Sequence, residues 1–453
     1  MKKAKSPVKN TLPPAQLSRV PNYTLWGALS VCAVIAVLWF FTGEGWFSAN
    51  TYNSYALQAK AWLSERLDIG GTGLYFKHLE IAEYMGKYYV SFPPFPSLVL
   101  LPFVFLFGIQ APGSASAALT FDHMLAAASS VLAFVYAMKL AREYGKTDLS
   151  AMLWALFLTV GGNFILVMAS GWVWFIAQTF AFSLTLAALY YAKKPCFSGR
   201  NAKTPPVRAR FSRPKKAPAF DRRRSAALPL FLICAAVLCR PFNIVALPFV
   251  VWLLYKSGRL PDFKDAKGIL KTLLPAALLV LAALWLNFAR FGNPLEFGHN
   301  YLPEFLEAEK GQFSLSYIPK NFFNLIRLPS VGREGRLDFP IFDGMCIFLA
   351  CPVYLSYLIL FIKKAVKKQA AKTDFAICSA LLIWLLFFTA HKTMGGWQFG
   401  NRYTADCLPL LFAGLMRLTE NGEKAFLPHI PLFLFGFALN LTGSIALING
   451  WLI

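Results

Sequence analysis

Long apolar runs are the feature of this sequence that most restricts its fold. Residues 23–42 contain no charged side chain and reach the ~20 residues that a helix needs to cross a bilayer. Only 15% of the chain is charged, 57% is hydrophobic and the mean hydropathy is +0.50, so lipid must cover much of its surface. The first run follows a basic leader (1–22). It is too long for a signal-peptide core and lacks a clear cleavage site, which predicts an uncleaved first helix.

The hydropathy pattern predicts an all-α integral membrane protein with about eleven transmembrane helices in one polytopic domain, 23–453. We expect these helices at 23–43, 118–140, 149–168, 172–192, 226–239, 241–256, 270–288, 341–362, 374–390, 404–418 and 426–449.

A further apolar run, 92–108, is interrupted by Pro93, Pro94, Pro96 and Pro102. Prolines suit an interfacial or re-entrant element better than a straight span. We therefore expect this run not to cross the bilayer, and to be irregular or only briefly helical.

The charge distribution supports this arrangement. With the N-terminus in the cytoplasm and 92–108 not crossing, nearly all of the net charge of +23 falls on cytoplasmic segments, as the positive-inside rule requires. The loop 193–225 is the most basic segment, with twelve Lys or Arg residues and a single acid. It is typical of a disordered topology anchor near anionic lipid. No folded nucleic-acid-binding motif accompanies the basic residues, so we expect no nucleic-acid partner.

Three outer segments are too long or too polar to be simple connectors, namely 44–117, 289–340 and 391–403. Loops of this kind on a helical scaffold usually carry function. In the first, residues 52–66 place Tyr55, Ala59 and Trp62 at helical spacing, which predicts an interfacial helix with these residues in lipid.

Further along the same loop, Gly86 predicts a turn that brings Glu80 close to the arm from Tyr88 to Pro94. A carboxylate, aromatic rings and a rigid arm at the membrane surface fit a sugar-binding cleft. An interfacial aromatic belt with solvated acids is the alternative interpretation.

The sequence at this point resembles the GT-C glycosyltransferases, which include the protein O-mannosyltransferases and the bacterial aminoarabinose transferase. The likeness lies in the order of helices and loops and in the runs EIAEYMGKYYVSFPPFPSLVLLPF (80–103), NFARFGNPLEFGHNY (287–301) and GGWQFGNRYTAD (395–406). These runs are similar to stretches in uncharacterised bacterial members. The resemblance implies a polyprenyl-phosphate sugar as donor, a plasma-membrane location in bacteria, and a catalytic carboxylate in the first outer loop.

The catalytic carboxylate is expected to be Glu80, with Glu83 and Asp68 as alternatives. GT-C enzymes often carry an acidic pair shortly after the first helix, where this chain reads Ser48 to Asn53 without an acid. Glu80 instead lies ahead of the Pro-Pro arm, as an aspartate does in the O-mannosyltransferases. On a helical turn Glu80 and Glu83 would share one face.

Four of the cations outside the cytoplasmic segments are candidates for binding the lipid phosphate. Arg290, Arg402 and Lys392 lie beside membrane boundaries, and Arg240 lies between two short helices at membrane depth. Structural pairing of Arg402 with Asp406 and of Arg290 with Glu296 is the alternative. The remaining residues expected around a sugar and acceptor cleft are Tyr52, Asn53, Tyr55, Tyr88, Tyr89, Pro93, Pro94, Glu296, Trp397, Gln398 and Asp406.

These observations predict sugar transfer to an acceptor hydroxyl on the outer face, with a glycan, lipid or protein as acceptor. A transporter or flippase, or a catalytically silent assembly subunit, are the alternatives. The five histidines show no metal-ligand spacing, so no metal is expected.

Overall fold

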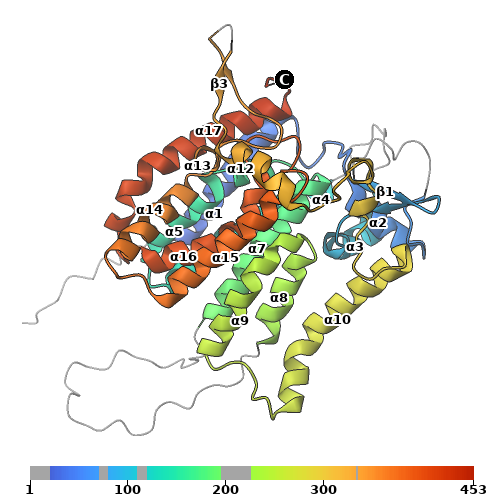
Figure 1. The fold of residues 1–453 in the computed structure, drawn as a ribbon, viewed down its shortest axis with the longest axis horizontal. Coiled ribbons are helices and arrows are strands. Elements are labelled where there is room, and N and C mark those ends of the chain that lie inside the picture. The colour runs from blue at the N-terminus through green and yellow to red at the C-terminus, as the bar shows by residue number, and fades with distance from the viewer. Residues whose placement is uncertain (1–20, 71–79, 110–119, 195–225, 333–334, 453) are drawn as a thin grey trace, which may run out of the picture.

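A computed structural model describes residues 21–70, 80–109, 120–194, 226–332 and 335–452 (Figure 1). The protein is predominantly helical, and six of the described helical segments are long and apolar enough to cross a membrane, as expected of a multi-pass membrane protein. The predicted leader and the basic loop lie almost wholly outside the described residues.

The secondary structure follows the chain as α-helices, 3₁₀ segments and short strands. The helices are α1 (Tyr23–Thr42), α2 (Ser54–Leu63), α3 (Phe95–Phe107), α4 (Phe121–Glu143), α5 (Asp148–Val160), α6 (Phe164–Val167), α7 (Val173–Lys193), α8 (Ala227–Val237), α9 (Leu247–Lys256), α10 (Ala266–Phe291), α11 (Pro303–Leu306), α12 (Ile318–Ile326), α13 (Ile347–Ala350), α14 (Val353–Val366), α15 (Lys372–Thr389), α16 (Leu408–Leu418) and α17 (Ile430–Ile448). The 3₁₀ segments include η2 (Pro241–Ala246), η3 (His299–Tyr301) and η5 (Arg402–Cys407). The strands are β1 (Ile81–Tyr84), β2 (Lys87–Val90), β3 (Ser330–Val331) and β4 (Leu337–Asp338).

Helix α7 forms the centre of the bundle, and α7, α8, α9 and α10 run side by side (Figure 1). In the most apolar 18-residue stretch of α7, 89% of the residues are buried inside the protein, against 22% in the corresponding stretch of α10. Its Ala, Ser and Thr residues let neighbours approach closely, as in many membrane bundles. Ser183 lies 2.7 Å from Ser129 of α4, and Ser129 also donates to the Thr179 carbonyl. The packing of α7 in the bundle thus fixes the position of its ends, from which several site residues project.

Each predicted span has a helical counterpart, but not all are long single helices. The segment 149–168 is divided into α5 and α6 by Gly161 and Gly162, and 341–362 begins as the short α13. α8 and α16 have only 11 residues each, which is short for a straight span. Six helices of the described residues have the length and composition of a membrane span, so the expected number of eleven is not confirmed.

The proline-containing run 92–108 differs from the expectation, because Phe95–Phe107 forms a regular helix, α3. Pro96 is accommodated because it lies in the first turn, where its missing N–H leaves no bond unmade. The 13 residues of α3 reach roughly 20 Å, less than the ~30 Å of a bilayer core. The length thus favours a non-spanning element. Of the two expected forms, irregular or briefly helical, the structure shows a helix of 13 residues.

Helix α2 was expected to place Tyr55 and Ala59 in lipid, and the structure corrects this. Both side chains are buried inside the protein, in the cluster where α2 packs on α3. Helical spacing identified the apolar face, and another helix covers it. Lys60, Glu65 and Arg66 are exposed as expected.

Glu80 precedes a hairpin rather than a helical turn. β1 pairs with β2 so that Glu83 lies opposite Tyr88, and the Ser91 N–H donates to the Glu80 carbonyl at 3.1 Å. Met85 and Gly86 form the turn, both with positive φ (51° and 70°). Side chains alternate between the two faces of an extended strand. Glu80 and Glu83 are three residues apart, so they point to opposite faces of the hairpin. The predicted turn at Gly86 is confirmed, and the shared face was wrong.

Candidate functional site

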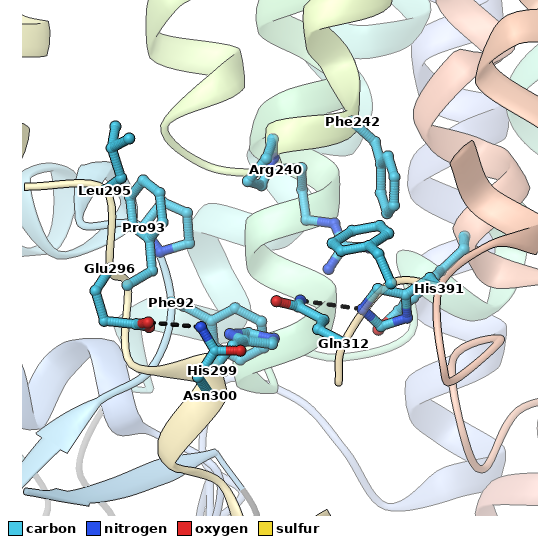
Figure 2. A pocket seen from close by; sticks show the side chains of 14 residues that line it. Phe92, Pro93, Arg240, Phe242, Leu295, Glu296, His299, Asn300, Gln312 and His391 are labelled. Atoms are coloured by element: carbon cyan, nitrogen blue, oxygen red, sulfur yellow. Dashed lines mark hydrogen bonds between the residues drawn. The ribbon is translucent and has the colours of Figure 1, made fainter. Parts of the chain in front are cut away.

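Two neighbouring cavities bring together seven of the eighteen predicted site residues. The first, here the Glu80 cavity, has a volume of about 360 Å³ and is lined by Tyr52, Glu80, Trp172, Trp174, Phe175, Glu304, Thr393, Gly395, Gly396, Trp397, Arg402 and Tyr403. The second, here the His391 cavity, has a volume of about 230 Å³ (Figure 2). It is lined by Phe92, Pro93, Arg240, Pro241, Phe242, Leu295, Glu296, Phe297, His299, Asn300, Gln312, Phe313, His391 and Tyr403.

Glu80 presents one free carboxylate oxygen. The Trp174 indole N–H donates to its Oε1, while Oε2 is buried and has no hydrogen-bond partner among the described residues. The hairpin fixes the Glu80 backbone through the bond from Ser91. The carboxylate is therefore oriented on one side and available for a proton on the other.

An aromatic wall stands beside Glu80. The Tyr52 ring centre lies 5.3 Å from that of Trp172 and 4.8 Å from that of Trp174. On the other side, Trp172 lies 6.3 Å from Trp397. Such rings offer flat apolar faces with a polar edge, which suits a sugar.

The backbone of this wall is held by the start of α4. Gly171 donates its N–H to His123 Nδ1 at 2.6 Å, and its carbonyl accepts from Asn50 at 3.0 Å. A Cβ at Gly171 would lie 2.4 Å from the Asp122 backbone, so only glycine fits. His123 Nε2 also lies 3.1 Å from Glu44, an acid just past α1 that the sequence interpretation overlooked.

Arg402 is the buried cation of the Glu80 cavity. Its Nε and Nη2 donate to the Gly395 carbonyl at 3.2 and 2.8 Å, and its backbone N–H donates to Gln398 Oε1 at 2.7 Å. Nη1 has no partner among the described residues. Gly395 adopts φ +112°, which a side chain would resist, so the loop depends on this glycine. Arg402 is thus anchored with one donor left over.

Glu304 is a second carboxylate in the same cavity, and the sequence interpretation missed it. Partial burial, and then the charge of Glu80, raise the pKa of Glu304, while Lys392 opposes this. Lys392 itself donates through Nζ to the Glu304 carbonyl. The 289–340 and 391–403 loops therefore meet the first outer loop here. No sequence spacing connects residue 304 to residue 80.

Arg240 and Asp406 form a buried ion pair at 3.0 Å. Gln178 of α7 donates to the other Asp406 oxygen at 3.1 Å. The alternative interpretation, a pairing of Arg402 with Asp406, is wrong, because Asp406 pairs with Arg240. Arg402 lies only four residues from Asp406 in the sequence. Arg240, which follows α8, is distant in the sequence, and the packing of the helices brings it to Asp406.

Arg290 is not among the described residues that line either cavity. It donates to the Val90 carbonyl at 3.0 Å and to Asn287 Oδ1 at 2.8 Å, tying α10 to the hairpin. The alternative pairing with Glu296 is not formed, because Glu296 accepts from the Gly298 N–H at 2.5 Å and from Asn300 at 2.6 Å.

The other predicted residues line neither cavity. Of the alternative bases, Glu83 is exposed on β1, and Asp68 binds Arg66 at 2.9 Å. Tyr89 packs on Phe291, with ring centres 5.2 Å apart, and Tyr55 packs on Phe92, at 6.1 Å. The remainder are Asn53 beside the start of α2, Tyr88 on β2, and Pro94, which lines an apolar groove with Leu98 and Trp285.

Comparison with known proteins gives a limited result. No family model matches this chain, and no curated protein matches it. Among solved structures, the oligosaccharyltransferase of Archaeoglobus fulgidus is similar at 12% identity and a TM-score of 0.44, over 94% of this chain and 56% of that one. ArnT from Cupriavidus metallidurans, bound to undecaprenyl phosphate, is similar at 13% identity and a TM-score of 0.44, over 87% of this chain and 60% of that one.

One of these structures is thus named as an oligosaccharyltransferase, and the other holds a polyprenyl phosphate. This chain spans less than two thirds of the length of either. At TM-scores of 0.44 neither likeness carries an argument about this protein, whose chemistry has to follow from its own residues.

Proposed function

We propose that this protein transfers a sugar from a polyprenyl-phosphate donor to an acceptor hydroxyl on the extracytoplasmic face of the membrane. The observation that carries the proposal is the Glu80 carboxylate, which accepts from Trp174 through one oxygen and has no partner among the described residues at the other. A positioned carboxylate of this kind can take the proton of a hydroxyl as its oxygen attacks the anomeric carbon.

The leaving group explains the need for Arg402. When the new glycosidic bond forms, the bond between the anomeric carbon and the phosphate oxygen breaks, and negative charge grows on the phosphate. The spare Nη1 donor of Arg402 would stabilise that charge in a site partly shielded from water. Lys392, beside Glu304, supplies a second cation.

The aromatic wall completes the site. Trp172, Trp174 and Trp397 would hold the apolar face of the transferred sugar. The donor class follows from the resemblance of the three loop runs to GT-C enzymes. A transporter would instead need charged or polar groups along a path through the spans.

The direct test incubates the purified full-length protein with radiolabelled polyprenyl-phosphate sugars and an extract of envelope lipids and glycans. Transfer of label that depends on Glu80 is the expected result. Label that stays on the donor with wild-type protein, across the sugars tested, would contradict the proposal and favour a silent subunit.

A further inference from the structure

The His391 cavity takes no part in the chemistry proposed for Glu80, yet it contains an ordered set of polar atoms. The tautomer of His391 determines which hydrogen-bonding atoms face this cavity. The Nδ1 of His391 lies 2.8 Å from the Thr393 carbonyl oxygen and 3.2 Å from the Thr393 backbone nitrogen, and the shorter contact, to an atom that can only accept, favours the tautomer with the proton on Nδ1. The Nε2 atom is then an acceptor, and it receives the amide N–H of Gln312 at 3.1 Å. This leaves the Gln312 carbonyl oxygen directed into the cavity (Figure 2).

His299 adds a second acceptor on the opposite wall. Its Nδ1 lies 2.6 Å from the Ser91 carbonyl, so this nitrogen is the donor and Nε2 carries the lone pair. The ring is held between Phe92 and Phe305, with ring centres 5.2 and 5.7 Å away. Gln312 and His299 together require a ligand that donates hydrogen bonds.

The charges lining the cavity are already matched. Arg240 is paired with Asp406, and Glu296 accepts two hydrogen bonds, from Gly298 and Asn300. Burial lowers the pKa of His391 to about 4, so this ring is neutral at pH 7. A phosphate would need an unmatched cation, and the described lining residues do not offer one. The cavity is suited to an uncharged ligand.

Shape and position narrow the ligand further. Phe92, Phe242 and Phe313 give flat apolar walls, and about 230 Å³ is the size of a single ring rather than a lipid chain. The cavity touches the Glu80 cavity at Tyr403. α11 also joins the two, because Glu304 lines the Glu80 cavity and the adjacent Phe305 lies 5.6 Å from His391.

We propose that the His391 cavity binds an uncharged saccharide, whose hydroxyls donate to Gln312 and His299, and that this saccharide is part of the acceptor. The inference rests on the proposed transfer reaction and names the chemical class of its acceptor. It predicts that the protein recognises a neutral sugar ring even when no donor is present.

The test is saturation-transfer NMR on the full-length protein in a detergent without a sugar headgroup. The probes are the methyl glycosides of glucose, mannose, galactose and N-acetylglucosamine. At least one should receive saturation from the wild-type protein. Gln312→Leu should weaken that binding by about tenfold, because one hydrogen bond in the partly buried cavity is lost. Gln369→Leu, the same change at an exposed position, should not.

Two further probes separate the alternatives. Inorganic phosphate should not compete, and methyl glucosaminide, which is cationic, should not be the only glycoside bound. Competition by phosphate, exclusive binding of the cationic sugar, or no saturation of any neutral glycoside would each overturn the inference. Melting temperatures show whether Gln312→Leu is folded, and Asn300→Leu serves as the second cavity variant if it is not. Because binding is measured without a donor, a failure of sugar transfer would leave this result readable.

Discussion

Arg240 and Arg402 both place their guanidinium groups over the ring of Tyr403, at 4.5 and 4.9 Å from its centre. Each cation is also anchored elsewhere, Arg240 by Asp406 and Arg402 by the Gly395 carbonyl. Tyr403 lines both cavities, so the wall between them depends on one ring that two cations hold in place.

Replacing Glu80 by Gln should lower sugar transfer by about 10²–10⁴-fold while leaving donor binding largely intact, because general-base catalysis typically contributes that much. The amide oxygen can still accept from Trp174, so the local structure is kept. Initial rates with labelled donor provide the measurement. Glu83→Gln, at an exposed position on β1, is the matched control and should behave as wild type. If the control is inactive and Glu80→Gln is not, the base is misassigned.

Arg402→Lys should raise the KM for the lipid-phosphate donor by about 10–100-fold, the worth of a lost hydrogen bond to a charged group. Lysine keeps the charge but cannot bind the Gly395 carbonyl and a phosphate with a planar fork. Arg327→Lys, an exposed arginine of the second outer loop, is the control. Equal KM values for the two variants would remove Arg402 from the donor site.

Arg240→Met should destabilise the protein by about 3–5 kcal/mol, because it leaves the Asp406 carboxylate buried and without its cation. Melting curves of the protein in detergent measure this. The double change Arg240→Met with Asp406→Leu should recover much of the loss, since no unpaired charge remains. A double variant as unstable as the single one would mean that the pair matters for packing rather than charge.

His391 should make stability fall as the pH drops below about 6.5. Burial lowers its folded-state pKa from 6.5 to about 4, so between these values only the unfolded chain takes up the proton. Folding is therefore favoured above pH 6.5 and loses on the order of 3 kcal/mol toward pH 4. His391→Gln should show a shallower decline of melting temperature between pH 7 and 4.5. An unchanged slope would show that other groups dominate the acid response.

The predicted topology places residue 199 in the cytoplasm and residue 311 outside. Reporter fusions at these two positions, one reporter active only in the cytoplasm and one active only outside, should give opposite signals. An outside signal at 199 would reverse the orientation of the whole chain and move both cavities to the cytoplasmic face.

Sequence reasoning located elements better than contacts. The turn at Gly86 follows from glycine's freedom at positive φ, a local property that a few residues determine. Tyr55 and Ala59 show the first limit, because helical spacing reveals an apolar face and not whether lipid or another helix covers it. Asp406 shows the second. Its partner Arg240 comes from another helix, and proximity in sequence favoured Arg402 instead. Glu304 joined the site for the same reason, through the fold alone.

The close packing of Gly171 against the start of α4 affects the free energy of ligand binding. Both backbone groups of this residue are bound, so the segment that carries Trp172 and Trp174 is already ordered before any sugar arrives. The loss of conformational entropy in that wall occurs during folding rather than during binding. More of the contact energy of a sugar ring stacked on this wall would then appear as affinity. Selectivity would depend on the shape of the wall more than on a rearrangement of the loop.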